Sequence, residues 1–231
     1  MILFRDIYFK AISLFDDPDI QLAFSQDVVR FEKLMYPYLS NGVHYFTNPT
    51  KISFMLIEQT DPNGKIETFI GDGTDTVTLS TTPPANADFS YMINGKYVYD
   101  ATYDATTNTV TFAEPIAAGA EISVEWYFSG SFDADFSKAA TAYVPEDIIV
   151  ARVKEIMARA LILCWSEEER NFVLEIKNIL TDTDFKIYSP ANSVRAKTEW
   201  VNQIRHDFDS MQTKLAWDVA TRRRNGGTYY G

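Results

Sequence analysis

The sequence contains few of the side chains that catalysis and metal binding use most often. Its 231 residues include one cysteine, Cys164, and two histidines, His44 and His206. A single cysteine excludes an intramolecular disulfide and a zinc site built from cysteines, and two histidines disfavour His-rich metal sites and most catalytic triads. No apolar run approaches the roughly 20 residues that a membrane-spanning helix needs, and residues 1–6 lack the basic start of a signal peptide. We therefore expect a soluble protein without membrane contact, kept in a reducing cytoplasm or released from it.

Motifs of nucleotide and acyl chemistry are also missing. Neither the P-loop pattern G-x-x-x-x-G-K-[ST] nor the nucleophile elbow G-x-S-x-G occurs. Gly71-Asp72-Gly73 is a bare G-x-G between two predicted strands, which favours a hairpin turn. Four aspartates are interpreted as turn and cap residues rather than metal ligands: Asp72, Asp75, Asp133 and Asp135. The sequence thus predicts no enzyme activity, no catalytic residues, no metal and no cofactor.

Basic charge is scarce in the middle of the chain. The protein has 21 basic and 32 acidic residues, a formal net charge of −11. Residues 51–140 hold four basic and thirteen acidic side chains, whereas residues 141–231 hold thirteen of each. Because phosphate is repelled by negative charge, the middle segment is predicted not to bind nucleic acid.

Apolar residues repeat every three to four positions near the N-terminus, which predicts helices. The first stripe comprises Phe4, Ile7, Tyr8, Ala11, Ile12 and Phe15. Asp17-Pro18 suits the N-cap and first position of a second helix. The stripe of that helix comprises Ile20, Phe24, Val28, Phe31, Met35 and Tyr38. Pro37 is expected to end or kink it, and Ser40-Asn41-Gly42 to form a turn.

From about Lys51 the apolar period changes to two, which predicts strands. Asp61-Pro62-Asn63-Gly64 is typical of a turn, and Asn94-Gly95 predicts a hairpin over residues 91–98. The alternating residues Ile122, Val124, Trp126 and Phe128 indicate a half-buried strand. Several short strands at this spacing predict a small β-sandwich of roughly 80 residues.

The helical period returns after Ser131. Pro145 is expected at the first position of a helix whose buried face comprises Ile149, Val153, Ile156, Ala160 and Leu163. Ser166 and Glu169 match a capping box, which predicts a new helix there; its apolar face comprises Phe172, Val173, Ile176, Ile179 and Leu180. Ser189-Pro190 begins a long helix to Arg223, about 50 Å in length. Its coiled-coil seam comprises Val194, Val201, Ile204, Phe208, Met211 and Leu215, and Asp218 is expected to weaken the next position.

These patterns together predict an α+β protein: a helical bundle with a long C-terminal helix and an inserted antiparallel β-sandwich. Four regions are expected: 1–50 for the N-terminal helices, 51–130 for the inserted β-sandwich, 131–224 for the C-terminal helices and 225–231 for an extended tail.

Short motifs in the middle segment resemble a β module that recurs in virion proteins of tailed bacteriophages. The motifs are Gly71-Asp72-Gly73-Thr74, Ile93-Asn94-Gly95, and Ala117-Ala118-Gly119 followed by Ile122 and Val124. Here isoleucine replaces the usual valine before Asn-Gly. The resemblance implies a virion protein without specifying the part of the virion.

A second segment is similar to phage structural proteins with helical cores, often encoded among head-to-tail connection genes. It comprises Gly130-Ser131-Phe132-Asp133, residues 148–165, Leu180 to Lys186 and Ser189-Pro190-Ala191-Asn192. The resemblance implies a neck adaptor: a homo-oligomeric ring that binds the portal protein and a tail or second neck protein. Double-stranded DNA would pass through its lumen without specific binding, and the protein would be made in the host cytoplasm and located in the neck or tail of the virion.

The C-terminal residues are the candidate partner-docking tail. Arg222, Arg223 and Arg224 either oppose the helix dipole or contact a partner, and Tyr229 and Tyr230 are aromatic anchors of the interface type. In neck adaptors such a tail often docks into the portal.

The sequence is also compatible with two other functions. One is a baseplate or fibre-attachment protein of the tail. The other is a β-sandwich module that binds carbohydrate or a host surface, for which Tyr97, Tyr99 and Tyr103 would supply stacking rings.

Overall fold

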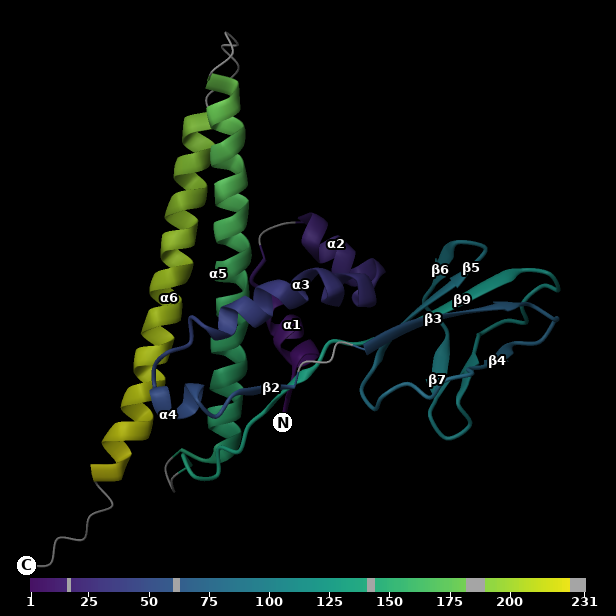
Figure 1. Cartoon of the computed structure of the whole chain (residues 1–231), viewed down its shortest axis with the longest axis horizontal. Coiled ribbons are helices and arrows are strands. Elements are labelled where there is room, and N and C mark those ends of the chain that lie inside the picture. Colours follow the sequence, from purple (N-terminus) through teal and green to yellow (C-terminus); the bar gives the residue numbers. More distant parts are fainter. Residues whose placement is uncertain (16–17, 60–62, 141–143, 182–189, 225–231) are drawn as a thin grey trace, which may run out of the picture. The chain divides into compact units, whose positions relative to one another are not determined.

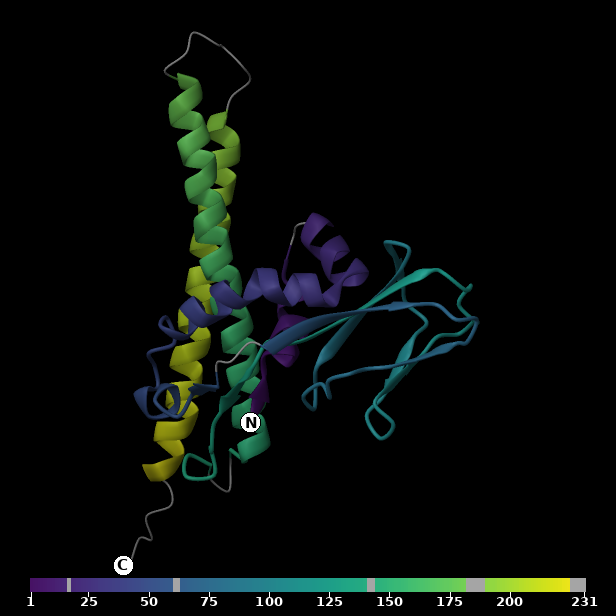
Figure 2. The same ribbon diagram turned by 45° about the vertical axis from the view of Figure 1, so that its right-hand side comes forward.

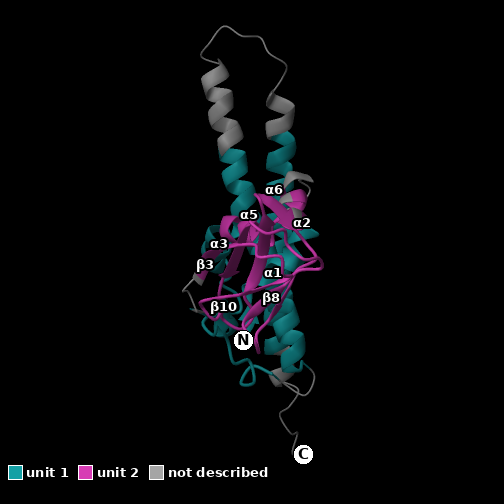
Figure 3. Ribbon diagram, turned by 90° about the vertical axis from the view of Figure 1, so that its right-hand side faces the viewer, with its two compact units in different colours: residues 1–16, 35–58, 131–231 teal, residues 17–34, 59–130 magenta. Residues whose placement is uncertain are grey.

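The computed structural model describes residues 1–15, 18–59, 63–140, 144–181 and 190–224 of an α+β protein with antiparallel sheets. The chain divides into two compact units (Figure 3). Unit 1 contains residues 1–16, 35–58 and 131–231, and unit 2 contains residues 17–34 and 59–130.

Helices make up most of unit 1. They are α1 (Phe4–Ile12), the second half of α3 (Val28–Val43), the short α4 (Thr50–Ser53), α5 (Glu146–Thr181) and α6 (Pro190–Arg224). Two short strands, β1 (Ile2–Leu3) and β10 (Ser131–Asp133), pair antiparallel and form a three-stranded sheet with β2 (Ile57–Gln59).

The first predicted helix is confirmed as α1, and it packs on α5. Phe4, Ile7, Tyr8 and Ala11 are buried in α1. On α5 the predicted face is confirmed, because Ile149, Val153, Ile156, Ala160 and Leu163 are all at most 1% exposed. Ring contacts continue this core: the rings of Phe4 and Phe132 lie 4.7 Å apart, and those of Phe15 and Trp165 lie 5.1 Å apart.

Helices α5 and α6 lie side by side along their length (Figures 1 and 2). Val201, Phe208 and Leu215 of the predicted seam are buried, Ile204 and Met211 are half-buried, and the side chain of Val194 lies outside the described residues. Asp218 forms a salt bridge to Arg152 of α5, so the acidic residue is accommodated by a charged partner.

Two predicted helix ends in unit 1 are wrong. Ser166 caps no new helix; its hydroxyl donates to the Ile162 carbonyl inside a continuous α5. The side chains of the apolar face predicted beyond it, residues 172–180, lie outside the described residues. Helix α3 likewise passes through Pro37 and Ser40-Asn41-Gly42 to Val43.

Packing explains why α3 continues. Met35 and Leu39, on either side of Pro37, are fully buried, which offsets the cost of proline within a helix. At Gly42 a Cβ atom would lie 3.1 Å from the carbonyl carbon of Ala160. Glycine is therefore needed for close packing against α5, and it does not form a turn.

Unit 2 contains two antiparallel sheets. One has the order β3-β9-β5-β6 and the other β4-β8-β7. The strands are β3 (Asn63–Ile70), β4 (Thr76–Thr78), β5 (Asp88–Ile93), β6 (Lys96–Val98), β7 (Thr102–Asp104), β8 (Thr109–Thr111) and β9 (Glu121–Phe128). Ile122, Val124 and Trp126 of β9 are buried in one cluster with Tyr91 of β5 and Val110 of β8.

The Asn94-Gly95 hairpin is confirmed. Ile93 pairs with Lys96, and both turn residues have positive φ, 51° at Asn94 and 74° at Gly95, as a two-residue turn of this kind requires. Gly71-Asp72-Gly73 does not form the predicted hairpin, because β3 and β4, which it connects, belong to different sheets.

The strand region also begins later than predicted. Residues 50–53 form helix α4, in which Ile52 is buried, and the first strand after it starts at Ile57. Asn63 and Gly64 belong to β3 rather than to a turn, and Asp61 and Pro62 lie outside the described residues.

Residues 17–34 group with the strands of unit 2. They contain α2 (Pro18–Gln26) and the first half of α3. The single helix predicted from Asp17 to Pro37 is therefore interrupted at Asp27. The rings of Phe24 and Phe31 lie 5.1 Å apart across this break.

The side chain of Glu67 on β3 is expected to make the stability of unit 2 depend on pH in the acid range. Burial alone would raise its pKa, but hydrogen bonds from Ser80, Lys65 and Thr81 outweigh this effect and lower the pKa from 4.5 to about 2. Its stabilising contribution is present above pH 4.5 and is lost as the pH falls from 4.5 to about 2. We expect Glu67→Gln to lower the free energy of unfolding at neutral pH, and the deficit to shrink below pH 4.5 in denaturant titrations. The exposed Glu121→Gln is the control, and a pH-independent deficit would contradict the assignment.

Candidate functional site

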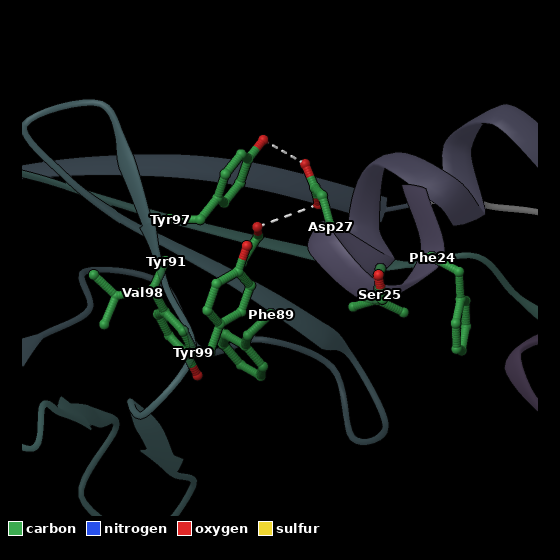
Figure 4. A pocket seen from close by; sticks show the side chains of 10 residues that line it. Phe24, Ser25, Asp27, Phe89, Tyr91, Tyr97, Val98 and Tyr99 are labelled. Carbon is green, nitrogen blue, oxygen red and sulfur yellow. Dashed lines mark hydrogen bonds between the residues drawn. The ribbon is translucent and has the colours of Figure 1, made fainter. Parts of the chain in front are cut away.

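A pocket of about 140 Å³ lies in unit 2 where the α2–α3 junction meets strands β5 and β6 (Figure 4). The α2–α3 junction contributes Phe24, Ser25, Asp27 and Val28. The strands and the residue after β6 contribute Phe89, Ser90, Tyr91, Tyr97, Val98 and Tyr99. The lining therefore combines aromatic rings with hydroxyl groups and one carboxylate.

Asp27 holds the polar side of the pocket together. Its Oδ1 accepts hydrogen bonds from the Arg30 backbone N–H at 3.0 Å and from the Ser90 hydroxyl at 3.2 Å. Its Oδ2 accepts the Tyr97 hydroxyl at 2.6 Å. Figure 4 shows the two side-chain bonds converging on the carboxylate. A carboxylate that is only 7% exposed is stabilised by such donors, since burial without them is costly.

Local helix chemistry places Asp27 at this point. Its carbonyl accepts the Phe31 N–H at 3.0 Å, the first turn of α3, while its side chain caps the Arg30 N–H. Aspartate is among the preferred residues for this N-cap position. The same carboxylate thus begins a helix and reaches two residues of the sheet.

Tyrosine acidity reflects this arrangement. The hydrogen bond to Asp27, followed by burial, raises the pKa of Tyr97 to about 12. Burial raises the pKa of Tyr91 to about 12 as well. Both phenols are therefore protonated at neutral pH, and Tyr97 acts as a hydrogen-bond donor.

The aromatic residues of the pocket differ in exposure. Tyr91 is 8% exposed, whereas Tyr99 is 68% and Tyr97 is 38% exposed. Tyr103, grouped with the last two from the sequence, is not in the lining. Its ring stacks on Phe89 at 4.6 Å, and its hydroxyl donates to Asn108 at 2.8 Å.

The site residues predicted from the sequence lie elsewhere. Arg222, Arg223 and Arg224 form the last turn of α6, with side chains outside the described residues. Tyr229 and Tyr230 also lie outside the described residues, so the docking tail stays a prediction.

Two of the four predicted turn aspartates have that role. Asp72 accepts the Thr74 N–H at 2.9 Å, and Asp135 accepts the Ser137 N–H at 3.0 Å.

Burial raises the pKa of the half-buried Cys164 thiol to about 12, so the thiol is protonated at neutral pH. His44, after α3, and His206, on α6, are both exposed.

In the described part of the chain, no cluster of three or more histidine, cysteine, aspartate or glutamate side chains is placed to hold a metal ion. None of the described helices combines the length and apolar character needed to cross a membrane.

Sequence reasoning missed Asp27. The apolar stripe continues through Phe24, Val28 and Phe31 without a break, so its period predicts one helix. The available signal for a helix cap was Asp27 itself, just before Val28-Val29. The third helical position after it is Arg30 rather than the glutamate or glutamine of a capping box.

The chain matches no protein-family model, no curated protein and no solved structure.

The carboxylate of Asp27 should be a main source of stability in unit 2. We expect Asp27→Ala to lower the free energy of unfolding by about 2–4 kcal/mol, because it removes a helix cap and leaves the buried Ser90 hydroxyl and the partly buried Tyr97 hydroxyl without their acceptor. Thermal and denaturant unfolding of Asp27→Ala, Tyr97→Phe and the double variant measure the coupling of the pair. The exposed Asp100→Ala is the matched control. Equal losses for Asp27→Ala and Asp100→Ala would contradict the role of Asp27.

Proposed function

We propose that the protein is a structural subunit of a tailed-bacteriophage virion, and specifically a head-to-tail connector that forms an adaptor ring between the portal and the tail. The observation that carries the proposal is the resemblance of residues 69–124 to a phage virion β module. In this proposal the chain has no catalytic role and acts through its interfaces.

The motif residues of that resemblance have structural roles in unit 2. Asn94 and Gly95 form the β5–β6 turn in positive-φ conformations. Gly119 has φ of 87°, and its N–H donates to the Gly71 carbonyl at 2.8 Å. Asp72 holds the loop after β3 through Thr74. The motifs thus coincide with positions that fix the β connections, which supports a shared module.

A β-sandwich and a helical bundle are the finer architecture that we propose. The buried cluster of unit 2 draws residues from both of its sheets, as in two packed layers. In unit 1, α1 and α6 both pack on α5, and residues 156–158 and 160–163 of α5 are all buried. A helix buried on several faces is typical of a bundle core.

Large apolar side chains on the surface support a protein that works through interfaces. In unit 1, Phe54 is 84% exposed, Trp217 is 67% exposed and Phe9 is 54% exposed. In unit 2, Ile66 and Ile70 of the edge strand β3 are 56% and 69% exposed. Exposed aromatic residues and hydrophobic strand edges are common at contacts between chains.

Charge is consistent with DNA passing without being held. Unit 2 contains four basic and fourteen acidic residues, nearly the whole net charge of the protein. An acidic surface repels the phosphate backbone. In the proposal, duplex DNA therefore crosses the ring lumen during genome ejection without specific binding, and the portal is contacted by the tail residues Arg222, Arg223, Arg224, Tyr229 and Tyr230.

Assembly of the purified full-length chain tests the proposal. We expect light scattering after size exclusion and negative-stain electron microscopy to show closed rings of many copies. Trp217→Ser and Phe54→Ser should reduce the ring population, because each replaces an exposed aromatic contact, whereas the exposed polar control Asn41→Ser should not. A chain that remains a monomer at all concentrations, alone and with portal protein, would contradict the connector function.

A further inference from the structure

The pocket of Figure 4 presents an exposed aromatic ring next to buried polar groups. Tyr99 is 68% exposed and Tyr97 is 38% exposed, although both contribute to the lining. Leaving a tyrosine ring in water forgoes the gain from its burial. The position of the rings beside a carboxylate suits a ligand that has both an apolar face and hydroxyl groups.

Asp27 has acceptor capacity for such a ligand. A carboxylate offers about four acceptor positions, and three donors bind to Asp27 within unit 2. These donors also fix its orientation, so a further hydrogen bond forms without additional ordering of the side chain. The hydroxyls of Ser25 and Tyr99 add polar groups to the lining.

Charge at the pocket disfavours an anionic ligand. The lining contains no lysine, arginine or histidine to bind an anion, and unit 2 has fourteen acidic residues against four basic ones. A cation is the competing ligand that the test below separates, because Asp27 and Glu125 are negative near Tyr97 and Arg30 is positive.

Size limits the ligand to a single ring. The pocket volume of about 140 Å³ is close to that of a cavity that holds benzene, so a bulkier pyranose would be only partly enclosed. A longer ligand would place one ring in the pocket and extend outward past Tyr99.

We infer that this pocket binds one ring of a neutral saccharide, which packs its C–H face on Tyr99 and hydrogen bonds to Asp27 and Tyr97. A pyranose combines the required features, namely an apolar C–H face and hydroxyl groups at its rim. The site is independent of the proposed connector function, since it uses residues of unit 2 alone.

Titration of the full-length protein with neutral oligosaccharides tests the site. The probes are maltotriose, cellotriose, galactobiose and the trimer of N-acetylglucosamine. Their binding is detected by saturation-transfer NMR and measured by calorimetry. We expect at least one probe to bind, Tyr99→Ala to weaken it about tenfold or more from loss of one aromatic contact, and Tyr99→Phe to retain it. Tyr45→Ala, an exposed tyrosine of unit 1, is the control and should bind as the unchanged protein does.

Several results would overturn the inference. These are no binding of any neutral probe, equal binding by Tyr99→Ala, or stronger binding of choline or sialic acid than of neutral sugars. The melting temperature of each variant separates loss of binding from loss of folding. If Tyr99→Ala is unfolded, the folded Tyr99→Phe variant is the test: retained binding supports the ring contact, and lost binding contradicts it. Ring formation is measured separately, so failure of the saccharide site leaves the connector proposal unaffected, and failure of ring formation leaves the saccharide site unaffected.

Discussion

A single buried carboxylate connects the helical and β parts of unit 2. Asp27 caps α3 through the Arg30 N–H and accepts hydroxyls from Ser90 and Tyr97 of the sheet. One side chain thus accepts donors from both helix and sheet and links the α2–α3 junction to strands β5 and β6. The pocket is lined by residues of this junction and of these strands, and residues 17–34 group with the strands.

Local patterns predicted much of the fold. The Asn94-Gly95 turn, the alternating strand β9 and the buried face of α5 were found from sequence because each depends on neighbours within a few residues. Helix ends were less predictable. Whether Ser166 caps a helix or bonds back within one, and whether Gly42 forms a turn or a close contact, depends on packing against distant residues. A one-dimensional pattern does not contain that information.

The candidate site was predictable only in part. Tyr97 and Tyr99 were recognised as exposed rings, but Asp27, which is seventy residues from Tyr97 in the chain, had no local signal that linked it to them. The sequence also grouped Tyr103 with these rings, although its contacts are to Phe89 and Asn108. Residue type thus drew attention to two aromatic residues of the pocket, whereas the set of residues that line it depends on how the strands and helices pack.

Hydrogen–deuterium exchange in the Asp27→Ala variant is the most direct test of the role of this carboxylate. Amides of residues 18–34 should exchange faster than in the unchanged protein, because α3 loses its cap and the junction loses its hydrogen bonds to Ser90 and Tyr97. Amides of α5 and α6 in unit 1 should keep their protection. Unchanged exchange in residues 18–34, or an equal increase across α5 and α6, would contradict the account.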